Sequence, residues 1–575
     1  MAQIPMKLVP ATLLVLGAMP SGLAAQTLDY GDLSGSDTDE VTSDDGGETA
    51  EPVSRPKKSS RRAQGNRVEV QPYIEVSQVA TAELSPGNDV LTFTQVAAGV
   101  DTALIGQHNA LSASVRYERR IAWNNKTSNG DTISGIASGY TTVMPGVQLH
   151  GGALATRTRV EDGGSSIIGP LGDGDAVTQL YSVYAGPTLS TMAGDVALSA
   201  GYRFGYTRVE SPDAVTTAPG SPGVDVFDDS TVHAANASAS LAPHTLLPVG
   251  IGVSGQVYRE DISNLDQRVD DRRAMGTVTV PLGPSLALSG SVGYEDVEIS
   301  ARDALRDANG DPVLGADGRF ITNKSAPRIL AYDVSGLIWD AGVMWRPSSR
   351  TALEAHVGRR YGSTSVSGSF HYAPSARSSF SIGAYDNVAG FGGRINNFLD
   401  GLSDDFVAVR NPITGDLTGC VSSLEAGNCM SGALGSVRSS TFRGRGVAAN
   451  YSYNFGSLRA GVGGGYDRRK FIAAPGTVLA SANGLVDENF WLAAYLDGRI
   501  DRHSSFSTHL FANWLQTGDA LASDVSAMGA TAAYYRSLTS RLSARAAIGI
   551  DTVNRADTLD DITGASALVG VRYNF

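Results

Sequence analysis

The chain has 575 residues, of which only 18% are charged and 67 are glycine, and its net charge is −13. Phosphate binding needs clustered positive charge, so this balance gives no reason to expect a nucleic acid as a partner. Alanine, serine, threonine, valine and tyrosine recur in short alternating runs, and such runs favour β-strands over helices.

The first 25 residues have the pattern of a secretory signal peptide. A short lead with Lys7 is followed by an apolar stretch from Leu8 to Met19 and by small residues that end at Ala25. We predict cleavage after Ala25, with cleavage after Ala24 as the alternative. The rest of the chain has no apolar run of about 18 residues, the length that a membrane-spanning helix requires.

Residues 26–65 are predicted to form a disordered periplasmic leader. An acidic block is followed by a basic one that contains Arg55, Lys57, Lys58, Arg61 and Arg62. Such a segment cannot bury enough apolar area to become ordered. Its basic end either contacts anionic envelope polymers or is a solvated tail.

From residue 66 to the end, apolar and polar residues alternate with the period of β-strands. The first run shows this with Val68, Val70, Ile74 and Val76 on one face. Short breaks between runs take turns with long ones, such as 160–177, 208–230 and 299–328. We therefore predict an all-β fold over 66–575: one transmembrane antiparallel β-barrel of about 22 strands, with short periplasmic turns and long extracellular loops.

The chain ends on a strand that would close this barrel. Every backbone polar group must be paired in hydrocarbon, so the last strand has to pair with the first. Val569, Val571, Tyr573 and Phe575 share the face that is predicted to meet lipid. This ending resembles that of bacterial outer-membrane barrels, in which the barrel-assembly machinery recognises a C-terminal strand with a final aromatic residue. The resemblance implies a Gram-negative outer membrane, with its lipid and that machinery as partners.

Residues 350–386 resemble the exosortase (PEP-CTERM) system-associated outer-membrane barrel family. The matching residues are Leu353, Glu354, Gly358, Arg359, Arg360, Tyr361, Gly362, Gly368, His371 and Arg377. The opening strands look like sphingomonad proteins that sometimes carry the label of preprotein translocase subunit YajC. A true YajC has one inner-membrane helix, which this chain lacks after its signal peptide. Both resemblances imply an envelope barrel in bacteria that export polysaccharide, which makes polysaccharide a candidate partner.

The two cysteines lie in a long loop over 386–440. Cys420 and Cys429 stand close together among glycines and serines, and in an oxidising compartment they are predicted to form a disulfide. A metal site is the alternative, but no His, Asp or third Cys lies nearby at ligand spacing. The loop either restricts the lumen of the barrel or caps its outer surface.

Neither an enzyme nor a cofactor is expected, because none of the eight histidines lies in a nucleophile or metal motif. An energised transporter is disfavoured as well, since only the leader precedes the first strand. Several charged residues are predicted to line the lumen, where they either select solutes by their field or pair across strands to hold the wall. These residues are Arg116, Glu118, Arg120, Arg203, Glu354, His356, Arg360, Arg545 and Arg572.

Two functions are compatible with these features. The first is a passive channel or conduit for small polar solutes or for exported envelope polymer. The second is a non-conducting structural or accessory barrel of a surface-polysaccharide or exosortase-linked system. The state of the lumen decides between them.

Overall fold

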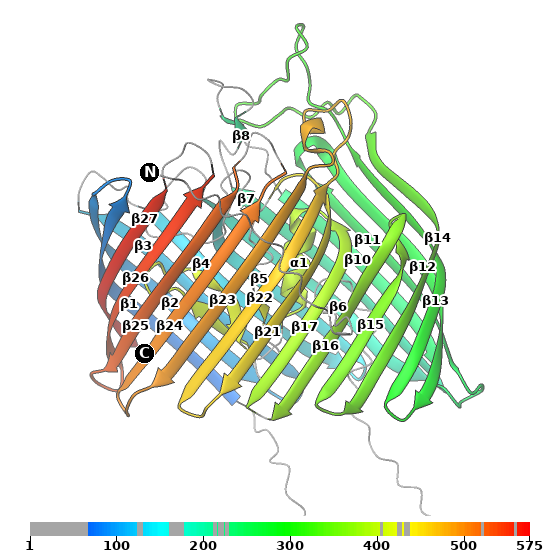
Figure 1. Cartoon of the computed structure of the whole chain (residues 1–575), viewed down its shortest axis with the longest axis horizontal. Coiled ribbons are helices and arrows are strands. Elements are labelled where there is room, and N and C mark those ends of the chain that lie inside the picture. Colours follow the sequence, from blue (N-terminus) through cyan, green and yellow to red (C-terminus); the bar gives the residue numbers. More distant parts are fainter. Residues whose placement is uncertain are drawn as a thin grey trace, which may run out of the picture.

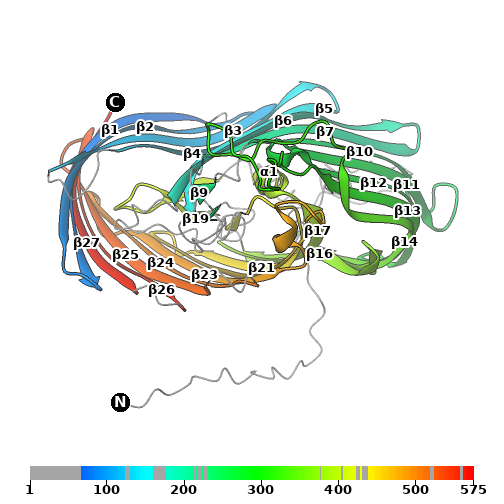
Figure 2. The ribbon, with the colours of Figure 1, turned by 90° about the horizontal axis from the view of Figure 1, so that it is seen from above.

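The computed structural model is a closed β-barrel (Figures 1 and 2). It describes residues 67–123, 130–159, 177–210, 215–216, 223–224, 229–375, 377–402, 406–422, 428–429, 438–518, 523–556 and 561–575. The predicted signal peptide and leader lie outside these residues. One sheet of 22 strands forms the wall.

The wall strands follow one another around the barrel in chain order, and each pairs antiparallel with its neighbours. They are β1 (Arg67–Ser85), β2 (Val90–Ile105), β3 (Asn109–Ala122), β4 (Gly130–Met144), β5 (Val147–Arg159), β6 (Val177–Ala193), β7 (Val196–Glu210), β10 (Asp229–Leu241), β11 (Gly250–Ile262), β12 (Gln267–Gly283), β13 (Leu286–Ala301), β14 (Ile329–Ser348), β15 (Thr351–Arg360), β16 (Ser363–Ser375), β17 (Ser378–Ala389), β21 (Phe442–Asn454), β22 (Leu458–Phe471), β23 (Val486–Arg499), β24 (Ser504–Gln516), β25 (Val525–Ser537), β26 (Leu542–Arg555) and β27 (Ile562–Asn574).

The first and last strands close the sheet. The register between β1 and β27 places Tyr73 opposite Asn574 and Ala82 opposite Ala565. A sheet can cross hydrocarbon only when it closes in this way, because an open edge would leave backbone groups unpaired. The predicted fold class, an antiparallel barrel of about 22 strands, is confirmed.

Connections differ in length between the two ends of the barrel. Turns such as 145–146, 194–195 and 284–285 join strands at one end, whereas loops such as 302–328 and 472–485 join them at the other. Short turns are typical of the periplasmic side, so we assign that end to the periplasm.

Some connections at the extracellular end are short as well, among them 86–89 and 263–266, and the shortest of these is a two-residue turn. Strands β15 and β16 are joined by Tyr361 and Gly362 alone, with φ angles of +53° and +68°. Two consecutive positive φ angles are the signature of a type I′ turn, the tightest common hairpin connection. The wall therefore has a low rim at this point, in contrast to the long loops that were expected on this side.

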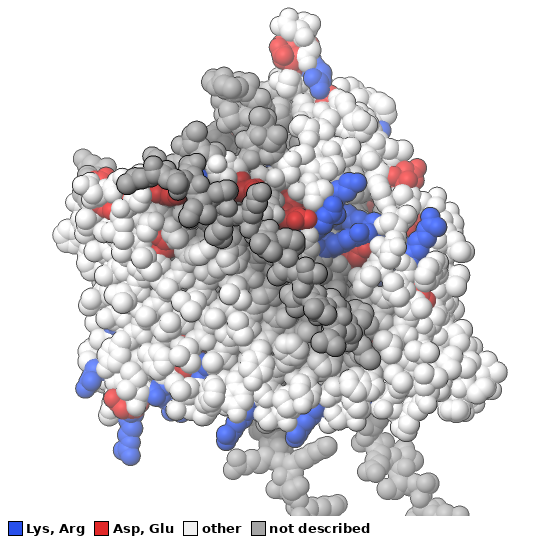
Figure 3. Space-filling view, viewed as in Figure 1, with Lys and Arg blue, Asp and Glu red and all other residues white. Residues whose placement is uncertain are grey.

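Outward-facing side chains form an apolar band around the wall. Val70 and Val76 on β1 are 52% and 46% exposed, and Val569 on β27 is 67% exposed. Figure 3 shows the charged side chains of one face near its upper and lower margins, with an uncharged belt between them. Such a belt on a closed barrel matches the hydrocarbon layer. The protein is an outer-membrane β-barrel of a Gram-negative bacterium.

Inward-facing aromatic rings lie against glycines of the neighbouring strand. A Cβ atom on Gly99 would come within 2.4 Å of the Tyr73 ring, and one on Gly152 within 2.4 Å of the Tyr184 ring. The absence of a side chain at these strand positions lets each ring pack flat on the backbone. This packing accounts for part of the high glycine content.

The connection between β17 and β21 turns into the barrel instead of away from it. Figure 2, a view from above, places its elements within the ring of wall strands. They are α1 (Phe391–Asp400), β18 (Val407–Arg410), β19 (Leu417–Ser422) and β20 (Asn428–Cys429). We call the described residues of 390–441 the inward segment. Of the described residues, no helix is long and apolar enough to cross a membrane.

An apolar cluster closes the space around α1. Phe391, Ile395, Phe398 and Leu399 recur at helical spacing on one face of α1, and all four are buried. They pack with wall residues and with residues of three extracellular connections, including η2 (Asn264–Asp266) and η3 (Ala480–Ala482) and their surroundings. A short hairpin of β8 (Val215–Thr216) and β9 (Gly223–Val224) lies in another extracellular connection. The inward segment and the extracellular loops thus share one core.

Candidate functional site

A wall carboxylate caps the N-terminus of α1. The residue at the start of the helix, Gly390, has no side chain to cap it. Glu260 on β11 takes this role, because its carboxylate accepts hydrogen bonds from the backbone N–H groups of Gly390 at 2.6 Å and Gly393 at 2.9 Å. Ser230 and Tyr258 donate their hydroxyls to the same carboxylate at 2.8 and 2.6 Å. Glu260 is fully buried, so each of its contacts is made away from bulk water.

The two ends of α1 meet wall charges of opposite sign. Negative charge stabilises a helix N-terminus and positive charge a C-terminus. Glu260 supplies the first, and Arg203 on β7 supplies the second through an ion pair with Asp400 and a hydrogen bond to Asn397. The field of the wall therefore fixes the direction in which the helix lies.

Close approach of α1 to the wall depends on a glycine. A Cβ on Gly393 would lie 1.8 Å from the Tyr258 hydroxyl oxygen and 2.5 Å from a Glu260 carboxylate oxygen. Any other residue at this position would push the helix away from its capping carboxylate. The Gly-Gly pair in the first turn is thus a packing requirement, in spite of the low helix propensity of glycine.

A second side chain of α1 reaches the opposite wall. The Arg394 guanidinium lies 2.9 Å from the Asp467 carboxylate on β22. Asp467 also pairs with Arg469 at 2.6 Å and accepts a hydrogen bond from the Tyr385 hydroxyl. In the sheet order β22 is far from β7 and β11, so α1 bridges the lumen.

Residues 410–416, which we call the tip of the inward segment, contact a different sector of the wall. Arg410 donates hydrogen bonds to the backbone oxygens of Ser114 and Ser134 at 3.0 and 3.1 Å and to their hydroxyls. Asp416 pairs with Arg157 on β5 at 2.5 Å. The Ile413 side chain enters an apolar cluster with residues of β1, β2 and β25 to β27.

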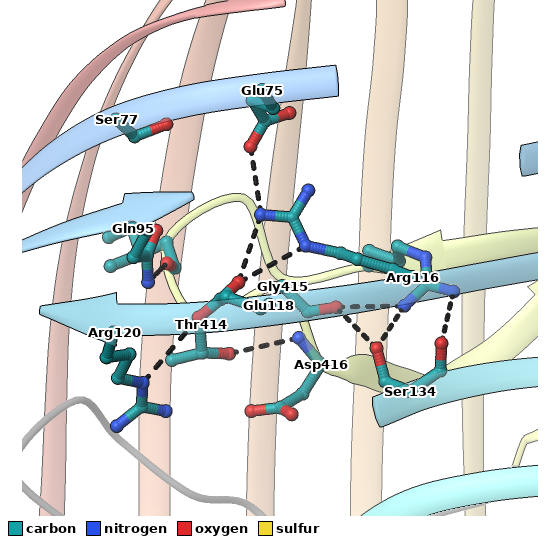
Figure 4. A network of polar contacts seen from close by, with 12 residues as sticks. Glu75, Ser77, Gln95, Arg116, Glu118, Arg120, Ser134, Thr414, Gly415 and Asp416 are labelled. Carbon is teal, nitrogen blue, oxygen red and sulfur yellow. Dashed lines mark hydrogen bonds and ion pairs between the residues drawn. The ribbon is translucent and has the colours of Figure 1, made fainter. Parts of the chain in front are cut away.

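A buried ion-pair network of the wall lies beside this tip (Figure 4). Arg116 on β3 contacts Glu75 at 2.9 Å and Glu118 at 3.0 Å. Arg120 lies 3.6 Å from Glu118, and Arg545 on β26 forms an ion pair with Glu75. Gly415 of the tip packs against Arg116 and Glu118 so closely that a Cβ would lie 2.7 Å from Arg116 Nε. The network therefore forms part of the wall surface against which the tip packs.

The remaining predicted lumen residues are also paired. Arg360 contacts Asp271 at 2.6 Å and Glu295 at 3.4 Å, and Arg572 contacts Asp101 at 3.0 Å. Every arginine that was proposed from the sequence therefore has a carboxylate partner. This pairing favours the role of holding the wall and the segment over the role of a free selectivity charge.

Glu354 and His356 form a separate, half-buried group with Asp340 on β14. The imidazole Nδ1 lies 3.0 Å from Asp340, and Nε2 lies 3.1 Å from Glu354. Gly342 leaves the space for the ring, because a Cβ there would come within 2.5 Å of Nδ1. Within the described residues no group of His, Cys, Asp and Glu has the arrangement of a metal site.

The backbones of Cys420 and Cys429 are directly opposite each other in the pairing of β19 with β20. Opposed residues of antiparallel strands have a Cα separation that a disulfide can bridge. Their side chains lie outside the described residues, so the disulfide stays a prediction.

Sequence reasoning found only part of the set that holds α1. Alternation along the strands places Arg203 and Asp467 on inward faces, but their contacts with α1 could not be known. Glu260 was missed, although it also alternates with outward residues on its strand. Arg394 lies in the stretch FGGRINNFLD, where two glycines and two asparagines predict a loop rather than a helix. Only the helical spacing of the apolar residues in this stretch favours a helix.

Comparisons with known proteins give neither a family nor a close relative. No family model and no curated protein sequence matches the chain. The FrpB iron transporter of Neisseria meningitidis (F5-1 variant, apoprotein form) is similar in structure, with a TM-score of 0.42, 12% identity, and coverage of 88% of this chain and 81% of that chain.

Two further solved structures have similar values. The siderophore receptor PirA of Acinetobacter baumannii has a TM-score of 0.41 at 10% identity over 88% of this chain and 81% of that chain. The copper transporter OprC has a TM-score of 0.37 at 10% identity over 89% of this chain and 82% of that chain. The expected resemblances to the exosortase-associated family and to YajC-labelled proteins find no support in these comparisons.

Proposed function

We propose that the protein is a passive outer-membrane channel for small polar solutes, and that the inward segment sets the width of its lumen. The observation that carries this proposal is the bridge formed by α1, which reaches from Glu260 on β11 to Asp467 on β22. A large barrel otherwise encloses a water-filled channel. A segment that side-chain contacts hold in the lumen narrows such a channel without filling it.

Charged and hydroxyl side chains on the inward faces support polar solutes as the cargo. Ser114, Ser134 and Thr207 are examples of buried hydroxyls that hydrogen-bond to the inward segment. An exported polymer is a less suitable cargo, because its passage would require α1 to leave two walls at once. Small solutes need only the space beside the segment.

Single-channel conductance in a planar bilayer tests this function. The wild-type protein is compared with a variant that lacks residues 391–436 and with a control variant that lacks residues 308–316. The control residues lie in the 302–328 connection, outside the buried cluster apart from Leu314. A shift in gel mobility on heating shows that each variant is a folded barrel.

We expect stable steps from the wild type, larger steps from the 391–436 deletion and wild-type steps from the control. Silence from both the wild type and the 391–436 deletion, with folded protein, would overturn the proposal in favour of a non-conducting barrel. Equal steps from the wild type and that deletion would keep a pore but remove the segment from its control.

A further inference from the structure

Five exposed arginines at the periplasmic end of the barrel form no ion pair with any residue that the structure describes, although Asp501 attracts the Arg536 guanidinium from the neighbouring turn. Arg350, Arg377, Arg502, Arg536 and Arg541 are exposed, and they lie in or beside the turns of β14–β15, β16–β17, β23–β24 and β25–β26. None of them forms an ion pair within the part of the chain that the structure describes. This contrasts with the arginines of the lumen and with a net charge of −13 for the whole chain. We call these residues the arginine rim.

The other half of the periplasmic end is largely apolar. Its turns, between β2 and β13, contain neither arginine nor lysine, and Asp195 is their one acidic residue. Instead, Met144, Met192, Leu246 and Leu282 are 56%, 63%, 75% and 58% exposed. The two halves therefore present different chemistry to the same leaflet.

The arginine rim lies at the level of an aromatic girdle. Tyr372, Phe455, Tyr534 and Phe575 are exposed near the same end, and the Arg536 guanidinium lies 3.5 Å from the Tyr534 hydroxyl. Aromatic girdles mark the interface between hydrocarbon and headgroups. Figure 3 shows basic side chains along this lower margin, below the uncharged belt. The guanidinium groups are thus placed at the height of lipid phosphates.

We propose that the arginine rim binds the phosphate groups of anionic phospholipids in the periplasmic leaflet. Guanidinium groups form paired, charge-assisted hydrogen bonds with phosphate oxygens. The apolar half of the same end contacts acyl chains. This inference does not depend on whether the lumen conducts, because it concerns the outer surface alone.

Native mass spectrometry of the full-length protein tests the proposal. The protein is released from detergent micelles that contain equal amounts of phosphatidylglycerol and phosphatidylcholine, and the two kinds of retained lipid are counted. The test variant carries Arg350→Gln, Arg377→Gln, Arg502→Gln and Arg541→Gln. The control carries Arg208→Gln, Arg272→Gln, Arg306→Gln and Arg319→Gln, which remove as many charges from the extracellular half.

We expect the wild type and the control to retain more phosphatidylglycerol than phosphatidylcholine. Because each basic residue near an anionic surface adds to the attraction, the preference should fall roughly tenfold in the test variant. The heat-induced gel shift verifies that the variants are folded. An equal preference in the test variant and the wild type would overturn the proposal.

Two competitors separate the lipid from other anions. Inorganic phosphate at millimolar concentration should leave the retained phosphatidylglycerol unchanged, since it lacks the acyl chains that the neighbouring girdle contacts. A synthetic peptide of residues 37–51, the acidic part of the leader, should displace little lipid. Tight binding of this peptide without any lipid preference would also overturn the proposal, by assigning the arginine rim to the leader.

Discussion

The two attachment points of the inward segment hold it in different ways. Helix α1 touches opposite walls, with Glu260 at one side and Asp467 at the other. The tip around Ile413 docks on one continuous sector of the wall, from β25 through β1 to β5. Helix α1 can be released only when its contacts with both walls break, whereas the tip can be released when its contacts with one wall break. We therefore expect the tip to be the more mobile part of the restriction.

The largest effect should follow from Glu260→Ala. This change leaves the N–H groups of Gly390 and Gly393 and the hydroxyls of Ser230 and Tyr258 without their common acceptor. Each buried donor that is left without an acceptor costs about 1–3 kcal/mol, and four donors lose theirs together. Hydrogen exchange should show that the α1 amides lose protection while those of the wall strands keep it. Unchanged α1 protection would contradict the role of Glu260 as the cap.

A smaller effect is expected for Arg394→Met, which releases α1 from the opposite wall. Asp467 keeps Arg469 and Tyr385 as partners, so its charge does not become isolated. We expect a loss of about 1–3 kcal/mol in the free energy of local opening of α1. In a double-mutant cycle with Asp467→Asn, an interaction energy near zero would show that α1 does not depend on this wall.

The tip should respond to acid. Burial opposes the charged form of Asp416, but the neighbouring Arg157 outweighs it and lowers the pKa of this carboxyl below its usual 3.8. A lowered pKa stabilises the docked tip above pH 3.8, and this contribution is lost as the pH falls through the docked value. Conductance steps should therefore enlarge when the pH falls below the pKa of the Asp416 carboxyl in the docked tip.

Two variants check the origin of this acid response. Asp416→Asn should enlarge the steps at neutral pH and abolish their further change with acid. Asp307→Asn is the control, because hydrogen bonds from the backbone N–H groups of Asp311 and Asn309 lower the pKa of Asp307 far from the tip. If Asp307→Asn removed the acid response as well, the tip would not be its source.

The smallest effect is expected for Arg119→Ala on the outer surface. Arg119 and Asp131 lie 2.6 Å apart, closer than most of the buried pairs, but both side chains are nearly half exposed. An exposed ion pair contributes about 0–1 kcal/mol. Thermal unfolding of the barrel and the protection of α1 should both stay close to wild type. A loss as large as that of Glu260→Ala would mean that distance matters more than burial in this barrel.

The wall could be predicted from the sequence because its signal is repeated. Alternation with period two recurs along the chain, and the last residues, from Val569 to Phe575, have the ending of an outer-membrane barrel. The pairing of β1 with β27 follows from the need to satisfy every backbone group. The structure confirms the fold class and the location. The signal peptide, the leader, the assembly partner and the disulfide stay predictions.

The candidate site could be predicted only in part, because it depends on contacts between distant residues. Arg116 and Arg545 were proposed as lumen residues from alternation, but their common partner, Glu75, depends on the register across three strands and the closure of the barrel. Helix α1 has ten residues, too few to be stable in isolation. It owes its stability to Glu260, Arg203 and the apolar cluster, which no local pattern reveals.

The position of the inward segment between β17 and β21 also bears on how the barrel is made. β7 and β11 precede α1 in the chain, so Glu260 can receive the helix while the sheet is still unfinished. Asp467 on β22 follows later, and the contact between β1 and β27 joins residues that are nearly the whole chain apart. Contacts of such separation form slowly. The barrel therefore closes after α1 has made its contact with Glu260. The hydrogen bonds between β1 and β27, which form last, enclose the inward segment.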